Sequence, residues 1–158
     1  MMIRIQQAMT VAEFLETIED RFGGVEGLRA HVKTHPRDVT AKLDLEDFAF
    51  YLNHPEMRYE KMERAVSLIP LTPKALSMFT KQRLALLEIL ADRRFESVRK
   101  LAEHLGRDVH NVHEDLKLFH WLGIIEFDRG PRNSRIPRLV ADSISVIPRK
   151  TTVEPIKA

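Results

Sequence analysis

The sequence predicts a mainly α-helical protein with a small β component (α+β), in which a helical region at residues 1–70 precedes a second domain at residues 71–150. Apolar residues recur at three- and four-residue spacing along most of the chain, which is typical of amphipathic helices. Pro70 and Pro73 interrupt this pattern and mark the expected junction between the two parts. We expect residues 151–158 to form a flexible tail.

The composition excludes several classes of protein. An apolar share of 44% is enough for a packed core. The chain has no cysteine, so disulfides, thiolate zinc sites and cysteine nucleophiles are excluded. No apolar run approaches the roughly 20 residues that a membrane helix needs, and the N-terminus lacks the pattern of a signal peptide. We therefore expect a cytoplasmic protein.

Charge is divided unevenly along the chain. Residues 1–70 carry 9 Lys/Arg against 12 Asp/Glu, whereas residues 71–158 carry 16 against 11. A basic excess confined to one part suggests that this part meets an anion.

The N-terminal elements follow from caps and periodicity. Ile3 and Ile5 alternate with polar residues, which predicts a short strand. Thr10 and Glu13 form a capping box that begins the first helix, and Gly23–Gly24 end it. A second helix is expected over residues 25–34. A third helix is expected to begin with Asp44 as its cap and to stop at Pro55. A fourth, in residues 56–69, would place Met62, Val66 and Ile69 on one face.

The C-terminal part has a more regular pattern. A helix is expected in residues 79–94, with Leu84, Leu87, Ile89 and Leu90 forming its apolar side. A short helix in residues 96–106 closes at Gly106, and a third covers residues 109–122. A strand at residues 124–127, a loop at residues 128–135 and a returning strand at residues 136–148 complete the domain.

This order of elements is that of a winged helix-turn-helix. Two helices joined by a tight turn cross steeply, which leaves one face of the second helix free. Such a face fits the DNA major groove, where every base pair presents a distinct pattern of donors and acceptors. The helix at residues 109–122 would present five polar side chains for DNA contacts: His110, Asn111, His113, Glu114 and Lys117.

The loop after the first strand supplies a second expected contact, because it carries four arginines and no acid between residues 129 and 138. Arginines there suit phosphates or a narrow minor groove. Residues at the start of the middle helix would hold flanking phosphates. The additional predicted DNA-binding residues are Ser97, Arg99, Lys100, Arg107, Arg129, Arg132, Asn133 and Arg135, with Arg138 as the fourth loop arginine.

The segment "SVRKLAEHLGRDVHNVHEDLKLFHWLGIIE" resembles a family of small prokaryotic winged-helix proteins described as DNA-binding regulators or antitoxins, with a MarR/ArsR-like wing. The resemblance covers roughly residues 72–147. It implies sequence-specific DNA binding, usually as a dimer and often at the protein's own operon. His110 stands where a basic residue is commoner in the family. The stretch "FHW" replaces a more polar one, so Leu118 and Trp121 form an additional apolar face for a partner or for the N-terminal helices.

Other chemistries have weaker support in the residues. His110 and His113 lie one helical turn apart, but "HNVHE" is not the "HExxH" order of a metalloprotease. We predict no metal site, no cofactor and no catalytic residues. Asp115 is expected to act as a cap or to pair with Arg99 or Lys117, rather than to belong to a catalytic pair.

The sequence therefore predicts a duplex-DNA-binding transcriptional regulator, a repressor or an autoregulatory antitoxin. A monomer would read too short a site, so a homodimer on a palindrome is expected. One alternative is a protein-interaction module that neutralises a toxin through residues 1–70, with DNA binding secondary or absent. A nucleic-acid enzyme or its accessory subunit is a further alternative, and it would need catalytic carboxylates that the pattern does not reveal.

Overall fold

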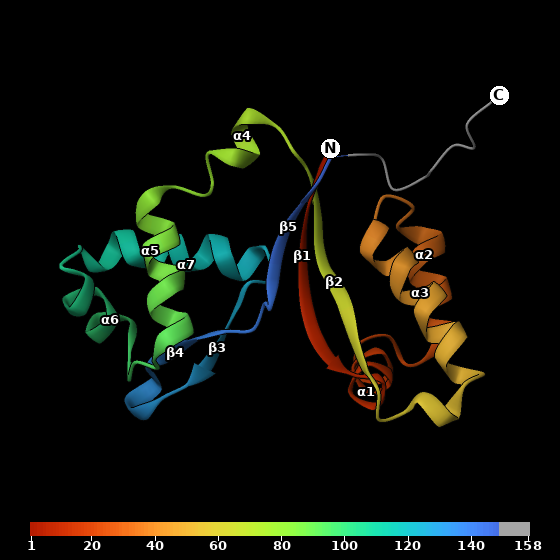
Figure 1. Ribbon diagram of the computed structural model, residues 1–158. Helices are drawn as coiled ribbons and strands as arrows, with labels where there is room; N and C mark the ends of the chain where they lie inside the picture. Colours follow the sequence, from red (N-terminus) through yellow and green to blue (C-terminus); the bar gives the residue numbers. More distant parts are fainter. Residues whose placement is uncertain (149–158) are drawn as a thin grey trace. The chain divides into compact units, whose positions relative to one another are not determined.

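The computed structural model describes residues 1–148 (Figure 1). Those residues form an α+β protein with seven α-helices and two small sheets. The chain divides into two compact units, one of Gln6–Leu68 and one that combines Met1–Ile5 with the described residues from Ile69 onward. The tail expected at residues 151–158 lies outside the described residues. No described helix combines the length and apolar character required to cross a bilayer.

The unit of Gln6–Leu68 has a core formed mainly by three helices. The capping box of the first helix is confirmed: the Glu13 N–H donates to Thr10 Oγ1 at 3.2 Å, and the Thr10 N–H donates to Glu13 Oε2 at 3.3 Å. Phe14, Ile18 and Phe48 are fully buried in this core. The elements that contribute to the unit are β1 (Met2–Thr10), α1 (Val11–Phe22), α2 (Val25–Thr34), α3 (Val39–Leu52), a 3-10 turn (Pro55–Met57) and β2 (Lys61–Pro70).

The expected fourth helix is wrong, because Lys61–Pro70 forms strand β2. Met62 and Arg64 are buried while Lys61 and Glu63 are exposed, which is the two-residue period of a strand. Pairing with β1 stabilises this conformation. The three- and four-residue spacing of Met62, Val66 and Ile69 had suggested a helix, but a distant strand decides the outcome.

The expected role of Asp44 is also wrong. The N-cap of α3 is Asp38, whose Oδ1 accepts the Ala41 N–H at 3.1 Å. Asp44 lies inside the helix and is 3% exposed. Its two carboxylate oxygens accept hydrogen bonds from Arg64 Nε at 3.0 Å and from Arg64 Nη2 at 2.9 Å. Asp44 therefore ties α3 to β2 instead of beginning α3.

The second unit contains four helices, which are followed by a hairpin and by strand β5. Ser97 and Asp108 cap α6 and α7, and Gly106 has a φ of +64° at the end of α6. The apolar side of α5 differs from the expectation, because Leu86 is buried while Leu84 is 47% exposed. The elements are α4 (Pro73–Leu76), α5 (Lys81–Asp92), α6 (Val98–Leu105), α7 (Val109–Trp121), β3 (Ile125–Arg129), a 3-10 turn (Pro131–Asn133), β4 (Arg135–Leu139) and β5 (Ser143–Ile147).

The single returning strand expected at residues 136–148 is in fact two strands. β4 pairs with β3 in an antiparallel hairpin, with Arg135 opposite Arg129 and Leu139 opposite Ile125. The N–H groups of Val140 and Ala141 both donate to Ile124 O and separate β4 from β5. β5 then joins a different sheet, whose strand order is β2-β1-β5 (Figure 1).

Candidate functional site

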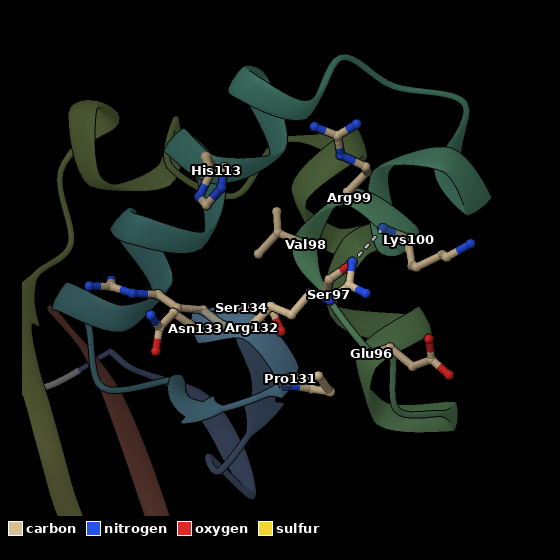
Figure 2. A pocket seen from close by; sticks show the side chains of 11 residues that line it. Glu96, Ser97, Val98, Arg99, Lys100, His113, Pro131, Arg132, Asn133 and Ser134 are labelled. Atoms are coloured by element: carbon tan, nitrogen blue, oxygen red, sulfur yellow. Dashed lines mark hydrogen bonds between the residues drawn. The ribbon is translucent and has the colours of Figure 1, made fainter.

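A cleft of about 720 Å³ lies between the amino end of α6, one residue of α7 and the tip of the β3–β4 hairpin (Figure 2). Its lining contains four cationic side chains and one acid, Glu96. Seven of the residues predicted from the sequence line it together: Ser97, Arg99, Lys100, His113, Arg132, Asn133 and Arg135.

The α6 wall is fixed by a helix cap. Ser97 Oγ accepts the Lys100 N–H at 3.2 Å, which is the dashed bond in Figure 2. Val98 packs inward at 4% exposure, so Arg99 and Lys100 on the next positions point outward. Lys100 Nζ lies 3.9 Å from Glu103 Oε2, a contact too long and too exposed to neutralise the lysine.

The hairpin tip is closed by a short hydrogen-bonded loop. The Gly130 N–H donates to Ser134 O at 2.7 Å, and the Ser134 N–H donates to Pro131 O at 3.0 Å. A side chain at Gly130 would place its Cβ 2.5 Å from Ser134 Oγ, so a larger residue would require the Ser134 side chain to move. Arg132 and Asn133 have φ angles of +55° and +62°. Asparagine tolerates this left-handed region, whereas arginine rarely adopts it, so the tip holds Arg132 in a strained conformation.

One of the predicted arginines, Arg138, is paired within the hairpin itself. Asp128 Oδ2 accepts hydrogen bonds from Arg94 Nη2 at 2.6 Å and from Arg138 Nε at 3.0 Å. The Arg135 guanidinium lies 5.5 Å from the centre of the Phe127 ring. Arg138 is therefore held against the hairpin, whereas Arg135 reaches the cleft and Arg129 is exposed at the end of β3.

The outer face of α7 carries His110, Asn111, Glu114 and Lys117, all of them exposed. Asp108 Oδ1 caps this helix by accepting the N–H groups of His110 at 2.9 Å and Asn111 at 3.3 Å. Lys117 Nζ lies 3.2 Å from Glu114 Oε1. These four residues lie outside the cleft, on the same helix as His113.

The partners expected for Asp115 are wrong. Asp115 is 6% exposed and accepts hydrogen bonds from Arg83 Nε at 2.8 Å and from Arg107 Nη2 at 2.7 Å, and not from Arg99 or Lys117. This trio ties α5 and the turn before α7 to the inner side of α7. Arg107 is thus mostly buried, and its Nη1 has no hydrogen-bond partner among the described residues. Arg107 was predicted together with DNA-binding residues that are exposed, but it lies mostly inside its unit.

Sequence reasoning missed several residues that build this region. Arg83, Arg94 and Asp128 find partners 32 or more residues away or across the hairpin, and no local pattern signals such pairs. Gly130 had a signal, since a glycine before a proline marks a turn. Trp121, expected to form an apolar face with Leu118, is 70% exposed, whereas Leu118 is half-buried.

The unit of Gln6–Leu68 carries a cleft of its own. It has a volume of about 640 Å³ and lies between α1 and the end of α3. Glu13, Glu16 and Glu19 line one wall, with Tyr51 and Arg58 among the residues opposite. No group of three His, Asp or Glu side chains within residues 1–148 is placed to hold a metal ion.

Two carboxylates in this unit have shifted pKa values. Burial alone would raise the pKa of Asp38, but hydrogen bonds from His31, the Ala41 N–H and Thr40 together lower it below 3.8. His31 Nε2 lies 2.8 Å from Asp38 Oδ2. For Asp47, burial and then the charges of Asp44 and Glu46 raise the pKa above 3.8.

Comparison with known proteins gives a match to a protein family. Residues 78–146 are similar to a protein family described as HVO_A0114. This segment includes the cleft, α5 to α7 and the β3–β4 hairpin, and it is less than half of the 158 residues. No curated protein and no solved structure matches the chain significantly.

Proposed function

We propose that this protein binds duplex DNA through a winged helix-turn-helix made of α5, α6, α7 and the β3–β4 hairpin. The observation that carries the proposal is the cleft, which gathers basic side chains from α6 and from the hairpin tip beside the outer face of α7. Helix and hairpin tip would then contact the duplex together, with the backbone phosphates entering between them.

Phosphate binding is the first step of the proposed mechanism. Arg99, Lys100, Arg132 and Arg135 are exposed around the cleft, and none of the three arginines forms an ion pair with a described carboxylate. Each contact with a phosphate releases counterions, which gives affinity that falls with salt concentration. These contacts fix the position of the protein on the duplex without reading its sequence.

Base reading is the second step, and the outer face of α7 supplies it. An asparagine such as Asn111 can bind adenine through two hydrogen bonds, and Glu114 can accept from cytosine N4. Val112 and Leu116 bury the opposite side of α7, and Asp115 is held by two arginines. α7 is therefore fixed within its unit, and its outer side chains need little ordering before they reach the bases.

The biological use that we propose is transcriptional regulation in the cytoplasm, as a repressor or an autoregulatory antitoxin. A homodimer on a palindromic site would double the number of base pairs read, which one recognition helix cannot supply alone.

Fluorescence anisotropy tests this function. A labelled duplex from upstream of the protein's own gene and a random duplex are titrated with protein across a salt series. We expect binding that weakens steeply with salt and prefers the native duplex. The Arg29→Ala/Arg37→Ala variant, which removes two exposed arginines of the other unit, serves as the control and should behave like wild type. Absence of binding to both duplexes at low salt would contradict the proposal.

Protein binding is a second candidate, and the exposure of Trp121 favours it. An exposed tryptophan is a frequent anchor of protein interfaces. Because this is the only tryptophan in the chain, a bound partner should shift its fluorescence to shorter wavelength. A toxin gripped through residues 1–70 would leave that fluorescence unchanged, so the two forms of this candidate can be told apart.

A further inference from the structure

Strand β5 is an edge strand. In the sheet order β2-β1-β5, no described strand pairs with β5 on the side away from β1 (Figure 1). The edge of a sheet presents backbone N–H and C=O groups that another strand can bind. Natural proteins protect such edges with charged residues, prolines or covering segments. The residues of β5 determine whether it has this protection.

The five residues of β5, "SISVI", contain no charge and no proline. Ile144 and Val146 point to the same face and are 40% and 56% exposed. The other edge strand, β2, differs: it includes Lys61, Glu63 and a terminal proline. Of the two edges of this sheet, only β2 is therefore protected by charge, while β5 combines a neutral edge with exposed β-branched side chains.

Two copies of β5 can pair antiparallel without bringing charges together. With Ser145 on the two-fold axis, Ile144 of one copy lies opposite Val146 of the other, and Ser143 lies opposite Ile147. Two apolar cross-strand pairs then form on the exposed face, and such pairs stabilise sheets. No like charges meet, because the strand has none.

An apolar groove continues the same surface. Leu84, Leu87 and Ile144 line a groove of about 410 Å³ between α5 and the start of β5. Leu84 is exposed at this groove and is not part of the core of its unit. A strand added beside β5 would extend the sheet next to this groove and remove apolar surface from water.

We propose that two copies of this chain associate through their β5 strands, paired antiparallel about Ser145, so that the three-stranded sheets join into one of six strands. An added strand can form backbone hydrogen bonds with the edge of β5, which stands at the end of the strand order among the described residues. A second copy fits because the pair brings no charges together and places the exposed side chains of Ile144 and Val146 opposite each other. The pairing gives the location of the dimer that the proposed function requires, but it does not depend on DNA.

Cysteine substitution tests the pairing directly, because the chain has no cysteine of its own. Opposed residues of antiparallel strands have Cα atoms about 4.5–5.5 Å apart, within the range of a disulfide. Ser145→Cys should therefore give a rapid intermolecular disulfide under mild oxidation. Ser77→Cys, at an exposed position after α4, is the matched control and should stay largely monomeric. Equal crosslinking of both variants, or none for Ser145→Cys, would overturn the proposal.

Charge exchange tests the register. The Ile144→Lys/Val146→Lys variant and the Ile144→Glu/Val146→Glu variant should each be monomeric in analytical ultracentrifugation, because like charges face each other across the two-fold axis. Mixed together, they should form a heterodimer. Circular dichroism checks that each variant keeps the helical content of wild type.

Wild-type protein should sediment as a dimer in the same experiments. A monomeric wild type, or a dimer that persists in the lysine variant, would place association elsewhere or exclude it, and either result rejects the pairing. All of these measurements are made without DNA. A failure of β5 pairing is thus distinguishable from a failure of DNA binding, which the anisotropy experiment measures.

Discussion

The two units of the protein carry clefts of similar size and opposite charge. The cleft of about 720 Å³ beside the hairpin is lined by four basic side chains and Glu96, whereas the cleft of about 640 Å³ beside α1 is lined by three glutamates and Arg58. The overall charge of +2 conceals this separation. The comparison indicates that the two units are suited to ligands of different chemistry, and only the first suits a polyanion.

The buried carboxylates of the two units also differ in the net charge of the clusters that they form with arginines. Asp44 is bound by one arginine through two hydrogen bonds, so the pair is neutral and closed. Asp115 is shared by Arg83 and Arg107, so its cluster retains a positive charge. One arrangement holds a helix to a strand, whereas the other holds α7 and adds to the positive potential of its unit.

The largest expected effect comes from removing Arg64, the partner of the buried Asp44. Arg64→Met leaves the Asp44 carboxylate buried without a partner and should lower the free energy of unfolding by about 3–5 kcal/mol. Urea denaturation followed by circular dichroism measures this change. The double variant Asp44→Leu/Arg64→Met should recover most of the loss. A single variant as stable as wild type would show that the pair is not isolated from water.

The shared carboxylate should matter less to stability. Asp115→Asn leaves two arginines close together, but their side chains are 27% and 16% exposed, so water relieves part of the repulsion. We expect a loss of about 2 kcal/mol in the free energy of unfolding. DNA affinity should fall as well, measured by anisotropy at a temperature where the variant remains folded. Unchanged affinity would show that DNA binding does not require the contacts by which Asp115 holds α7.

The basic cleft is tested by removing the two arginines at its hairpin side. Arg132→Ala with Arg135→Ala should weaken binding to all duplexes alike and reduce the slope of log affinity against log salt by about 2 at most. Stability should stay close to that of wild type, because both side chains are exposed. The Arg29→Ala/Arg37→Ala control changes the same net charge in the other unit. If it has an equal effect, the charge separation between the units is irrelevant to binding.

Asn111→Ala should change sequence preference rather than overall affinity. Loss of one bidentate base contact costs roughly 1–3 kcal/mol of discrimination between a correct and an incorrect base pair. Competition between the native duplex and single-base variants measures this loss. Tight binding with preference intact would mean that another surface than the outer face of α7 reads the bases.

The smallest expected effects concern how the stability of the unit of Gln6–Leu68 depends on pH. Because the pKa of Asp47 is raised on folding, its ionised form destabilises the protein, and Asp47→Asn should be slightly more stable than wild type at pH 7. The advantage should vanish below pH 3.8, where Asp47 is protonated in both states. Asp38→Asn should show the opposite sign, since a lowered pKa stabilises the folded state above pH 3.8 and loses this contribution on acidification. Parallel pH curves for both variants would contradict these assignments.

Local signals predicted part of the fold well. Thr10, Glu13 and Gly23 lie within one stretch of chain, so the first helix could be predicted from them, and the structure confirms its capping box. Lys61–Pro70 could not be assigned in this way, because a strand next to β1 depends on pairing with residues some sixty positions earlier. Asp44 could not be recognised as a buried partner either, since Arg64 is 20 residues away.

The residues of the candidate site could also be predicted only in part from the sequence. Ser97, Arg99 and Lys100 are neighbours in the sequence, and the order of the elements was enough to expect Arg132 and Arg135 near them. The pairing of Arg107 with Asp115 and of Arg138 with Asp128 could not be foreseen, because these contacts are set by the folded structure. Residue type shows which side chains are cationic, but only packing shows which of them pair with a carboxylate of their own unit.

The pairing of β1 with β5 has a consequence for biosynthesis. β1 leaves the ribosome before the other described elements, and its neighbour β5 leaves after them. Contacts between distant parts of a chain slow folding. During translation the three helices of Gln6–Leu68 can form before β5 is available to pair with one edge of β1. A nascent chain that stops before residue 143 would keep that edge uncovered, and such chains should depend more on chaperones than the finished protein does.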